Sequence, residues 1–288
     1  MEFLITFVNG LSLGGIYAMI ALGYTMVYGI AKMLNFAHGD IIMVGGYTIL
    51  VFLTVNPILA IIASIIFCMI MGMLIEKVAY KPLRGASPLA VLITAIGISY
   101  LLQSIAQMIF GSAPKFAVIA ELGTMNIGSV SIGYSTIITL VCSIVVMVAL
   151  TLFVKFSKTG RAMVAVSEDK GAAQLMGISV NNIIMITFAI GSALASLASV
   201  FFLLKAPTMT PTLGALPGIK AFTAAVIGGI GSIPGAMIGG LLLGVIECFA
   251  QAVPEIAPYT VAIEFGILIV ILLVKPTGLL GKKRREKV

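Results

Sequence analysis

Charged residues are scarce in this chain of 288 residues, in which Asp, Glu, Lys and Arg together make up 9% of the sequence. Soluble domains carry about 25%. Hydrophobic residues make up 60%, and the mean hydropathy is +1.20. Because one apolar membrane span needs about 20 residues, this length allows eight or nine spans and no sizeable soluble domain. The sequence therefore predicts an all-α, polytopic membrane protein.

Groups that perform bond chemistry or bind metals are also few. His38 is the only histidine, which excludes a histidine-based catalytic triad and a multi-histidine metal site. The three cysteines lie far apart within predicted spans, without metal-ligand spacing. No G-x-x-x-x-G-K-[ST] motif is present to bind ATP through a P-loop, and no acidic cluster suggests a calcium or magnesium site. We therefore expect no enzymatic activity, no metal and no cofactor.

The net charge of +7 is not accompanied by a nucleic-acid-binding pattern, because the basic residues lie in short loops between apolar runs. We expect a lipid bilayer, not nucleic acid, as the surroundings. The first residues contain the acid Glu2, with no basic n-region and no clear cleavage site. The first apolar run is therefore predicted to be a retained span.

Apolar runs predict nine membrane segments, or eight if one of them re-enters the bilayer. Their ranges are 3–28, 40–55, 58–75, 88–110, 134–154, 183–204, 219–230, 231–252 and 259–274. The range 219–230 is too short to cross alone. Gly228, Gly229, Gly231 and Pro234 interrupt the helix there, which predicts a re-entrant half-helix or a kinked span near 219–235. Such backbone must be covered by protein or line a wet cavity.

Lysine and arginine are divided unequally between the two sets of loops. One set contains Lys32, Lys77, Lys81, Arg84, Lys155, Lys158, Arg161, Lys170, Lys275, Lys282, Lys283, Arg284, Arg285 and Lys287. The other set contains Lys115, Lys205 and Lys220. The positive-inside rule places the first set, with the loop 155–181 and the C-terminus, in the cytoplasm. The N-terminus is then outside with nine crossings and inside if 219–230 re-enters.

The segment 160–180, GRAMVAVSEDKGAAQLMGISV, is polar and lies between two long apolar runs. It cannot lie in hydrocarbon, so it forms an ordered loop on one face of the bilayer. Small and apolar residues alternate there with Arg161, Glu168, Asp169 and Lys170. This pattern predicts a short amphipathic helix that packs into a groove on a soluble partner. A helix lying on the membrane surface is the alternative.

A few polar residues fall within or beside the predicted spans. Asn35, His38 and Asp40 belong to the segment N-F-A-H-G-D, in which Asp40 is predicted to cap the second span; a proton relay through His38 and Asp40 is the alternative. Glu247 and Glu264 lie inside spans and must pair, protonate or face water. We expect each to bond to a neighbouring helix, with a role in the translocation path or in coupling-ion binding as alternatives.

Glycines recur at a spacing of four residues, which places them on one face of a helix and lets backbones approach closely. The sets are Gly231, Gly235 and Gly239; Gly240 and Gly244; and Gly10 and Gly14. We expect these faces to pack within the subunit, with subunit contact or pore lining as the alternative.

Several motifs together resemble the permease subunits of branched-chain amino acid ABC importers over essentially the whole chain. They are N-G-L-x-x-G-x-x-Y-A at Asn9 to Ala18, A-L-G-Y-T-M-V-Y-G at Ala21 to Gly29, N-F-A-H-G-D at Asn35 to Asp40, G-R-A-M-x-A at Gly160 to Ala165, A-A-x-L-M-G-I at Ala172 to Ile178, K-A-F-T-A-A-V-I-G-G-I-G-S-I-P-G-A at Lys220 to Ala236, G-G-L-L-L-G-V-I-E at Gly239 to Glu247 and K-P-T-G-L-L-G at Lys275 to Gly281.

The resemblance implies one transmembrane domain over 1–288 that works in a bacterial or archaeal cytoplasmic membrane. A second homologous permease subunit, two cytoplasmic ATPase subunits and an extracytoplasmic substrate-binding protein complete the importer. The loop 155–181 would couple to the ATPase through Arg161, Glu168, Asp169, Ala172, Ala173 and Gly177. Many import permeases have E-A-A-x-x-x-G there, whereas this chain has Gly171 in place of the Glu, with Glu168 and Asp169 close by.

The predicted function is therefore ATP-driven import of leucine, isoleucine and valine. The same architecture carrying urea, amides or other amino acids remains an alternative. So does an ion- or proton-coupled secondary transporter that uses Glu247, Glu264 or His38, and so does a passive channel, which would leave the loop 155–181 without a role.

Overall fold

The computed structural model describes residues 2–127 and 130–281. Within these residues, seven helical stretches are long and apolar enough to cross a membrane. They are α1 (Glu2–Ala31), α3 (Pro57–Ile75) with the π turn Glu76–Tyr80, α4 (Pro88–Phe110), α5 (Tyr134–Phe156), α8 (Val180–Lys205), α10 (Ile233–Ala252), and α11 (Thr260–Val274) with the 3-10 turn Ala257–Tyr259. Two shorter apolar helices, α2 (His38–Leu53) and α9 (Ala215–Gly228), pack within the same bundle. The predicted polytopic helical architecture is confirmed.

Several of these helices begin directly after a residue whose side chain caps the helix. Asn56, Ser87 and Ser232 each precede a proline-containing first turn, and their side chains accept hydrogen bonds from backbone amides of α3, α4 and α10. A proline in the first turn costs no hydrogen bond, because the amides there have no partner within the helix. The apolar runs therefore begin as helices at defined residues.

The centre of the bundle is α1, which packs along α10 and also contacts α5, α8 and α9. A Cβ on Gly14 would lie 2.7 Å from the Cα of Leu241, and one on Gly10 would lie 2.8 Å from the Cα of Val245. Real Cβ atoms do not approach so closely, so glycine is needed at both positions. The glycine faces of α1 and α10 therefore pack against each other, and the prediction that they pack within the subunit is confirmed.

The third predicted glycine face is correct only in part. Gly235 packs against the backbone of Gly228, and Gly239 packs against Ala224, so both belong to a close contact between α9 and α10. Gly231 does not lie on this face. It precedes the start of α10, has a φ of 94°, and has open space where a Cβ would be. The four-residue spacing failed there because Gly231 lies outside the helix that defines the face.

The first half-helix is α2, which starts inside the bundle. The preceding helix α1 ends at Ala31, where Lys32 takes a left-handed conformation with φ of 61°. The chain then turns back, and His38 packs beside Gly23 of α1. Gly23 lies about 12 Å from Ala31 along the helix axis, at 1.5 Å of rise per residue. Residues 32–37 therefore bring α2 to a start well below the end of α1.

The second half-helix, α9, resolves the broken segment predicted near 219–235. Before it, β4 (Thr208–Met209) pairs with β1 (Lys115–Phe116), and the chain then runs to Gly214. A Cβ on Gly39 would lie 2.6 Å from the carbonyl oxygen of Gly214, so the N-terminal ends of α2 and α9 meet. Gly229 and Gly231, both with positive φ, and Pro234 then separate α9 from α10. The short strand β4, a turn at 211–214 and the half-helix α9 stand in place of a continuous span.

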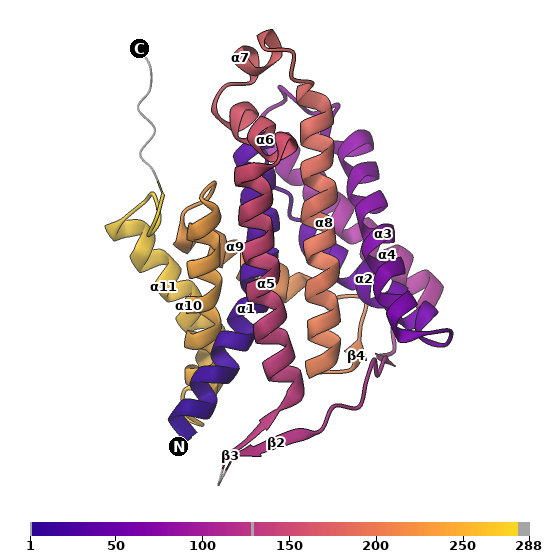
Figure 1. Cartoon of the computed structure of the whole chain (residues 1–288), viewed down its shortest axis with the longest axis vertical. Coiled ribbons are helices and arrows are strands. Elements are labelled where there is room, and N and C mark those ends of the chain that lie inside the picture. The colour runs from indigo at the N-terminus through magenta and orange to yellow at the C-terminus, as the bar shows by residue number, and fades with distance from the viewer. Residues whose placement is uncertain (1, 128–129, 282–288) are drawn as a thin grey trace.

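The two ends of the bundle differ (Figure 1). The helices α6 (Lys158–Glu168) and α7 (Lys170–Leu175) lie at one end, and the N-terminal end of α1 and the hairpin of β2 (Thr124–Ile127) and β3 (Val130–Gly133) lie at the other. The segment after α11 returns to the end of α9, where the amide of Leu279 donates to the carbonyl of Ile227 at 2.8 Å. The basic run at 282–287 lies outside the described residues.

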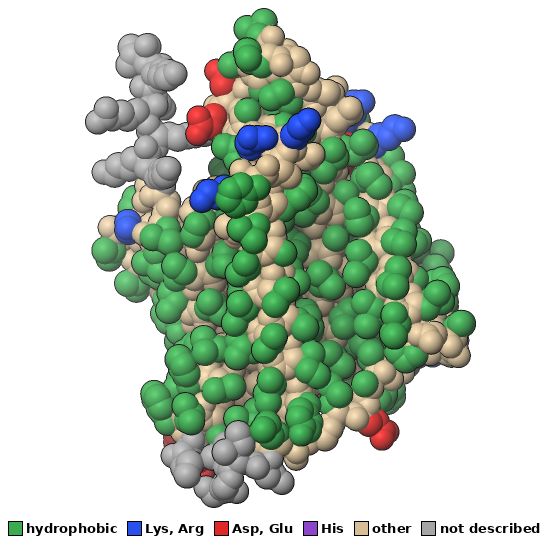
Figure 2. All heavy atoms as spheres, viewed as in Figure 1, with side chains coloured by type: hydrophobic (Ala, Val, Ile, Leu, Met, Phe, Trp, Pro, Cys, Tyr) green, Lys and Arg blue, Asp and Glu red, His purple; other side chains and the backbone are tan. Residues whose placement is uncertain are grey.

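The surface of the bundle shows the same division (Figure 2). Hydrophobic side chains cover most of the visible face, and Lys and Arg side chains gather above them, towards the end that carries α6 and α7. Large apolar residues of α3, α4, α5 and α11 are exposed, as expected for helices that face lipid.

Candidate functional site

The segment between α5 and α8 forms two helices, not the single helix that the sequence predicted. The side chain of Ser157 caps α6 by accepting from the amide of Gly160 at 2.8 Å. Asp169 separates the two helices and caps α7, accepting from the amides of Gly171 at 2.8 Å and Ala172 at 3.0 Å. Asp and Ser favour caps because their side chains satisfy amides that have no helical partner. The acid at Asp169 therefore has a structural role in the segment.

Gly177 follows the end of α7 and has the left-handed backbone conformation that glycine adopts without strain. Its φ is 81°, its amide donates to Gln174, and the amide of Ile178 donates to the carbonyl of Ala173 at 3.0 Å. This pair of bonds is the Schellman arrangement, in which glycine is the usual residue. The glycine that the sequence assigned to the coupling loop thus fixes the direction in which the chain leaves α7.

The two helices have distinct inward and outward faces. Gly160, Met163 and Val166 of α6 are buried, and so is Ala173 of α7. Of the residues assigned to ATPase contact, Ala173 therefore faces the permease itself. The others are exposed, namely Arg161, Glu168, Asp169, Ala172 and Gly177.

An apolar tip lies at the C-terminal end of α7, within the segment 160–180 that the sequence predicted to pack into a groove on a soluble partner. It consists of Leu175 and Met176, whose side chains are 90% and 81% exposed. Lys170 anchors the same helix, because its Nζ donates to the carbonyl oxygen of Ala31 at 3.1 Å. Burial lowers the pKa of Lys170, and the nearby charge of Arg84 lowers it further. An ordered pair of helices thus holds two apolar side chains away from the bundle.

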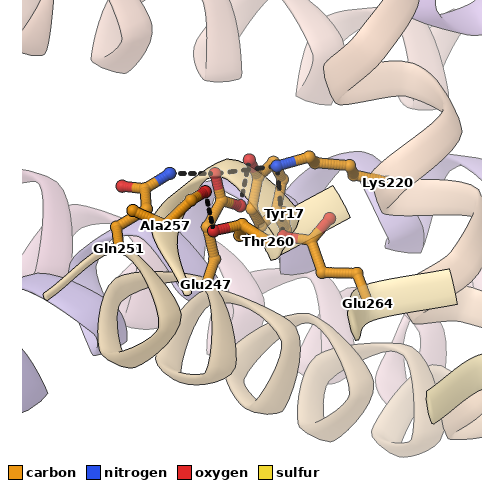
Figure 3. Close-up of polar contacts among 7 residues, drawn as sticks. All are labelled: Tyr17, Lys220, Glu247, Gln251, Ala257, Thr260 and Glu264. Atoms are coloured by element: carbon orange, nitrogen blue, oxygen red, sulfur yellow. Dashed lines mark hydrogen bonds and ion pairs between the residues drawn. The ribbon is translucent and has the colours of Figure 1, made fainter. Parts of the chain in front are cut away.

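A second group of functional candidates is a cluster of buried charges around Lys220 (Figure 3). The Nζ of Lys220 lies 2.8 Å from Oε1 of Glu247 and 3.1 Å from Oε1 of Glu264. The hydroxyl of Tyr17 donates to Glu247 at 2.7 Å, and the amide of Gln251 donates to the same carboxylate at 3.1 Å. The cluster therefore joins α1, α9, α10 and α11 at one point.

The position of Lys220 corrects the sequence analysis, which assigned it to a loop on the far side of the membrane. Its side chain is 5% exposed, and those of Glu247 and Glu264 are 8% and 1% exposed. Both acids bond to neighbouring helices, as expected: Lys220 pairs with each of them, and Glu247 also accepts from the hydroxyl of Tyr17. A lysine in an apolar stretch, together with two acids in later spans, was the signal available in the sequence.

The electrostatics of this cluster favour a structural role. Taking charges out of water into the bundle interior is costly, and the cost is offset only when the partners stay close and hydrogen-bonded. One carboxylate oxygen, Oε2 of Glu264, has no hydrogen-bond partner within the described part of the chain. In residues 2–127 and 130–281, no group of His, Cys, Asp and Glu is arranged to hold a metal ion.

The third candidate is the segment Asn35 to Asp40, where the prediction of a helix cap is wrong. Ala37 occupies the N-cap position of α2 and makes no side-chain cap. Asp40 lies in the first turn and accepts hydrogen bonds from Ser99 and from Gln103, the latter at 2.8 Å, both on α4. Because its carboxylate bonds to another helix, Asp40 ties α2 to α4.

The neighbours of Asp40 in sequence bond elsewhere. Asn35 accepts from the hydroxyl of Tyr80 at 2.8 Å. The ring of His38 stands edge-on to Tyr24, with 4.8 Å between centroids, and packs between Gly23 of α1 and Gly191 of α8. His38 and Asp40 thus face different helices. The candidate residues described above therefore form three separate groups: the α6–α7 segment, the cluster around Lys220, and the segment Asn35 to Asp40.

The chain matches the family model described as "Branched-chain amino acid transport system / permease component" over residues 6–272. The permease protein BraD of Pseudomonas aeruginosa, from a high-affinity branched-chain amino acid transport system, is 46% identical over 98% of this chain and 96% of its own length. The corresponding protein LivH of Escherichia coli (strain K12) is 40% identical over 100% of this chain and 98% of its own length.

The fold has a counterpart among solved structures. A chain of PsaBC from Streptococcus pneumoniae, solved in complex with Fab, superposes with a TM-score of 0.51 at 15% identity, covering 93% of this chain and 91% of that one. Such low identity supports the fold alone. The full-length match to the family model and to the two permeases goes further, and these permeases are membrane subunits without enzymatic activity. The chain belongs to the family of permease components of branched-chain amino acid transport systems.

Proposed function

We propose that this chain is a permease subunit of an ATP-driven importer of leucine, isoleucine and valine, with the α6–α7 end in the cytoplasm. The observation that carries the proposal is the exposed apolar tip, Leu175 and Met176, held outside the bundle by α6 and α7. Two large apolar side chains at the basic end of a membrane protein are typical of a surface that packs into a groove on a soluble subunit. The partner would be an ATPase.

The arrangement of α6 and α7 suits the transfer of motion. α7, which carries the tip, packs against α6, and α6 packs against α1, α5 and α8, so a force on the tip would reach the central helix α1 through α6. Energetic coupling requires an element with two arrangements that both partners bias. We expect the contact between the half-helices α2 and α9, at Gly39 and Gly214, to change during transport.

Two further partners complete the proposed importer. A second permease would share the translocation path, and an extracytoplasmic binding protein would dock at the opposite end, near the hairpin of β2 and β3. The substrate assignment is supported by the relatives, whose printed names specify branched-chain amino acid transport. A path lined by the glycine, alanine and isoleucine residues of the spans would suit substrates with apolar side chains.

The tip offers a sharp test of ATPase coupling. Leu175→Asp should weaken copurification of the ATPase and abolish uptake of labelled leucine in proteoliposomes, because a charge cannot enter an apolar groove without losing its hydration. Leu175→Met is the matched control and should retain both. If Leu175→Asp keeps normal copurification, ATPase stimulation and uptake, the tip is not the docking surface.

The energy source and the substrate need separate measurements. Uptake should follow internal ATP and continue when the proton gradient is collapsed, whereas a secondary transporter would stop. Competition by isoleucine and valine, but not by urea or amides, is expected. Competition by urea or amides alone would assign the same architecture to another substrate.

A further inference from the structure

A cavity of about 430 Å³ opens between the end of α5, the middle of α6 and the start of α10. Its walls include the apolar residues Val154, Val164, Ile233 and Pro234, the hydroxyl residue Thr151, and two cations, Lys155 and Arg161. Both cationic side chains are exposed. The cavity lies on a different helix from the apolar tip of α7, and none of its lining belongs to the charge cluster around Lys220. It combines an apolar interior with positive charge.

The cavity continues a helix face that is open to lipid. Val141, Val145, Val148 and Leu152 lie on one side of α5, and 48–59% of each of these side chains is exposed. The same helix then contributes Val154 and Lys155 to the cavity. Figure 2 shows Lys and Arg side chains just above the hydrophobic surface on the face where α5 lies in Figure 1. The cavity is therefore at the level where hydrocarbon gives way to headgroups.

The charges around the cavity have one sign. No acidic residue lines it. The first turn of α10, at Ile233 and Pro234, adds the partial positive charge of a helix N-terminus. Lys158, at the start of α6, is also exposed and lies three residues from both Lys155 and Arg161 in the sequence. A ligand that matches this site has an anionic group next to apolar chains.

We propose that this cavity binds an anionic phospholipid from the leaflet at the α6–α7 end, with its phosphate between Lys155 and Arg161 and its acyl chains along the exposed face of α5. Basic pockets at the ends of membrane helices favour anionic headgroups, and each nearby cation strengthens binding. The mostly apolar wall fits a lipid better than a free phosphate ion. Arg161 then serves the membrane rather than the ATPase, so α6 rests on lipid while α7 carries the apolar tip.

Native mass spectrometry of the purified full chain, titrated with phosphatidylglycerol or phosphatidylcholine, measures the proposed binding. Phosphatidylglycerol should be retained in preference to phosphatidylcholine. Lys155→Gln and Arg161→Gln should each weaken its retention about fivefold, and the double variant about 25-fold. The matched control is the double variant Lys77→Gln with Lys81→Gln, which removes two exposed cations at the same end of the bundle, outside the cavity.

Four results would overturn the proposal. Retention in the Lys155 and Arg161 double variant could equal that of the unchanged chain, or the control double variant could lose as much. Millimolar inorganic phosphate could displace the lipid, which would indicate a phosphate site. In the assembled transporter, a photoreactive label on Val164→Cys could cross-link to the second permease and not to lipid. Equal thermal unfolding midpoints for all variants ensure that a loss of lipid reflects the site and not misfolding.

Discussion

Lys220 of α9 and Glu247 of α10 form a buried ion pair with 2.8 Å between nitrogen and oxygen, across the turn at Gly229 to Ser232. Glu264 of α11 accepts from the same lysine at 3.1 Å. A half-helix has fewer turns than a full span and therefore makes fewer packing contacts with its neighbours. The lysine gives α9 a fixed position against two complete helices, and this explains why charges are tolerated so deep in the bundle.

Removing the cation should be far more harmful than removing the whole cluster. Lys220→Met leaves two buried carboxylates without a partner, and we expect a loss of about 3–5 kcal/mol of stability. Combining it with Glu247→Gln and Glu264→Gln should recover much of that loss, because no buried charge remains. Thermal unfolding in detergent, with uptake measured in parallel, checks both variants. A single variant as stable as the unchanged chain would show that the cluster is not a structural lock.

Glu264 separates the need for charge from the need for a hydrogen bond. Glu264→Gln keeps the size of the side chain and an oxygen to accept from Lys220, whereas Glu264→Ala leaves that contact unsatisfied, at about 1–3 kcal/mol. We expect the Gln variant to retain more stability and uptake than the Ala variant. Loss of uptake in the Gln variant, together with uptake that requires a proton gradient, would instead make Glu264 part of an ion pathway.

The contact between α1 and α10 should reject even one methyl group. A Cβ on Gly244 would collide with the backbone of Gly14, so Gly244→Ala should cost about 1–3 kcal/mol or prevent insertion. Gly97→Ala on α4 is the matched control, since no atom lies within 4 Å of its Cβ position. That change should leave stability the same or raise it by up to about 1 kcal/mol. Comparable unfolding midpoints for the two variants would contradict the close packing.

Asp169 distinguishes a helix cap from a charge that binds a partner. Asp169→Asn retains an acceptor for the amides of Gly171 and Ala172, whereas Asp169→Ala removes it and should cost α7 about 0.5–2 kcal/mol. Hydrogen exchange of the amides in α7 should accelerate only in the Ala variant, and leucine uptake should fall with it. If the Asn variant loses uptake while its exchange is unchanged, the charge itself contacts the ATPase.

The sequence by itself determined the class of the fold and the ends of many elements. Long apolar runs must become helices in lipid because the backbone amides and carbonyls have no water to bond. The glycine pairs at Gly10 and Gly14 and at Gly240 and Gly244 gave a correct packing face, because spacing within one continuous helix fixes the direction of each side chain. The same rule failed at Gly231, where the helix had not yet begun.

Only the tertiary structure decided which polar groups meet. Asp40 bonds to α4 instead of capping α2, and Lys220 lies between Glu247 and Glu264 instead of in a loop. Nothing local sets these contacts, since each partner comes from a different helix. The fold brings them together because two half-helices, α2 and α9, start inside the bundle, where a buried charge is stabilised only by a partner on a neighbouring helix.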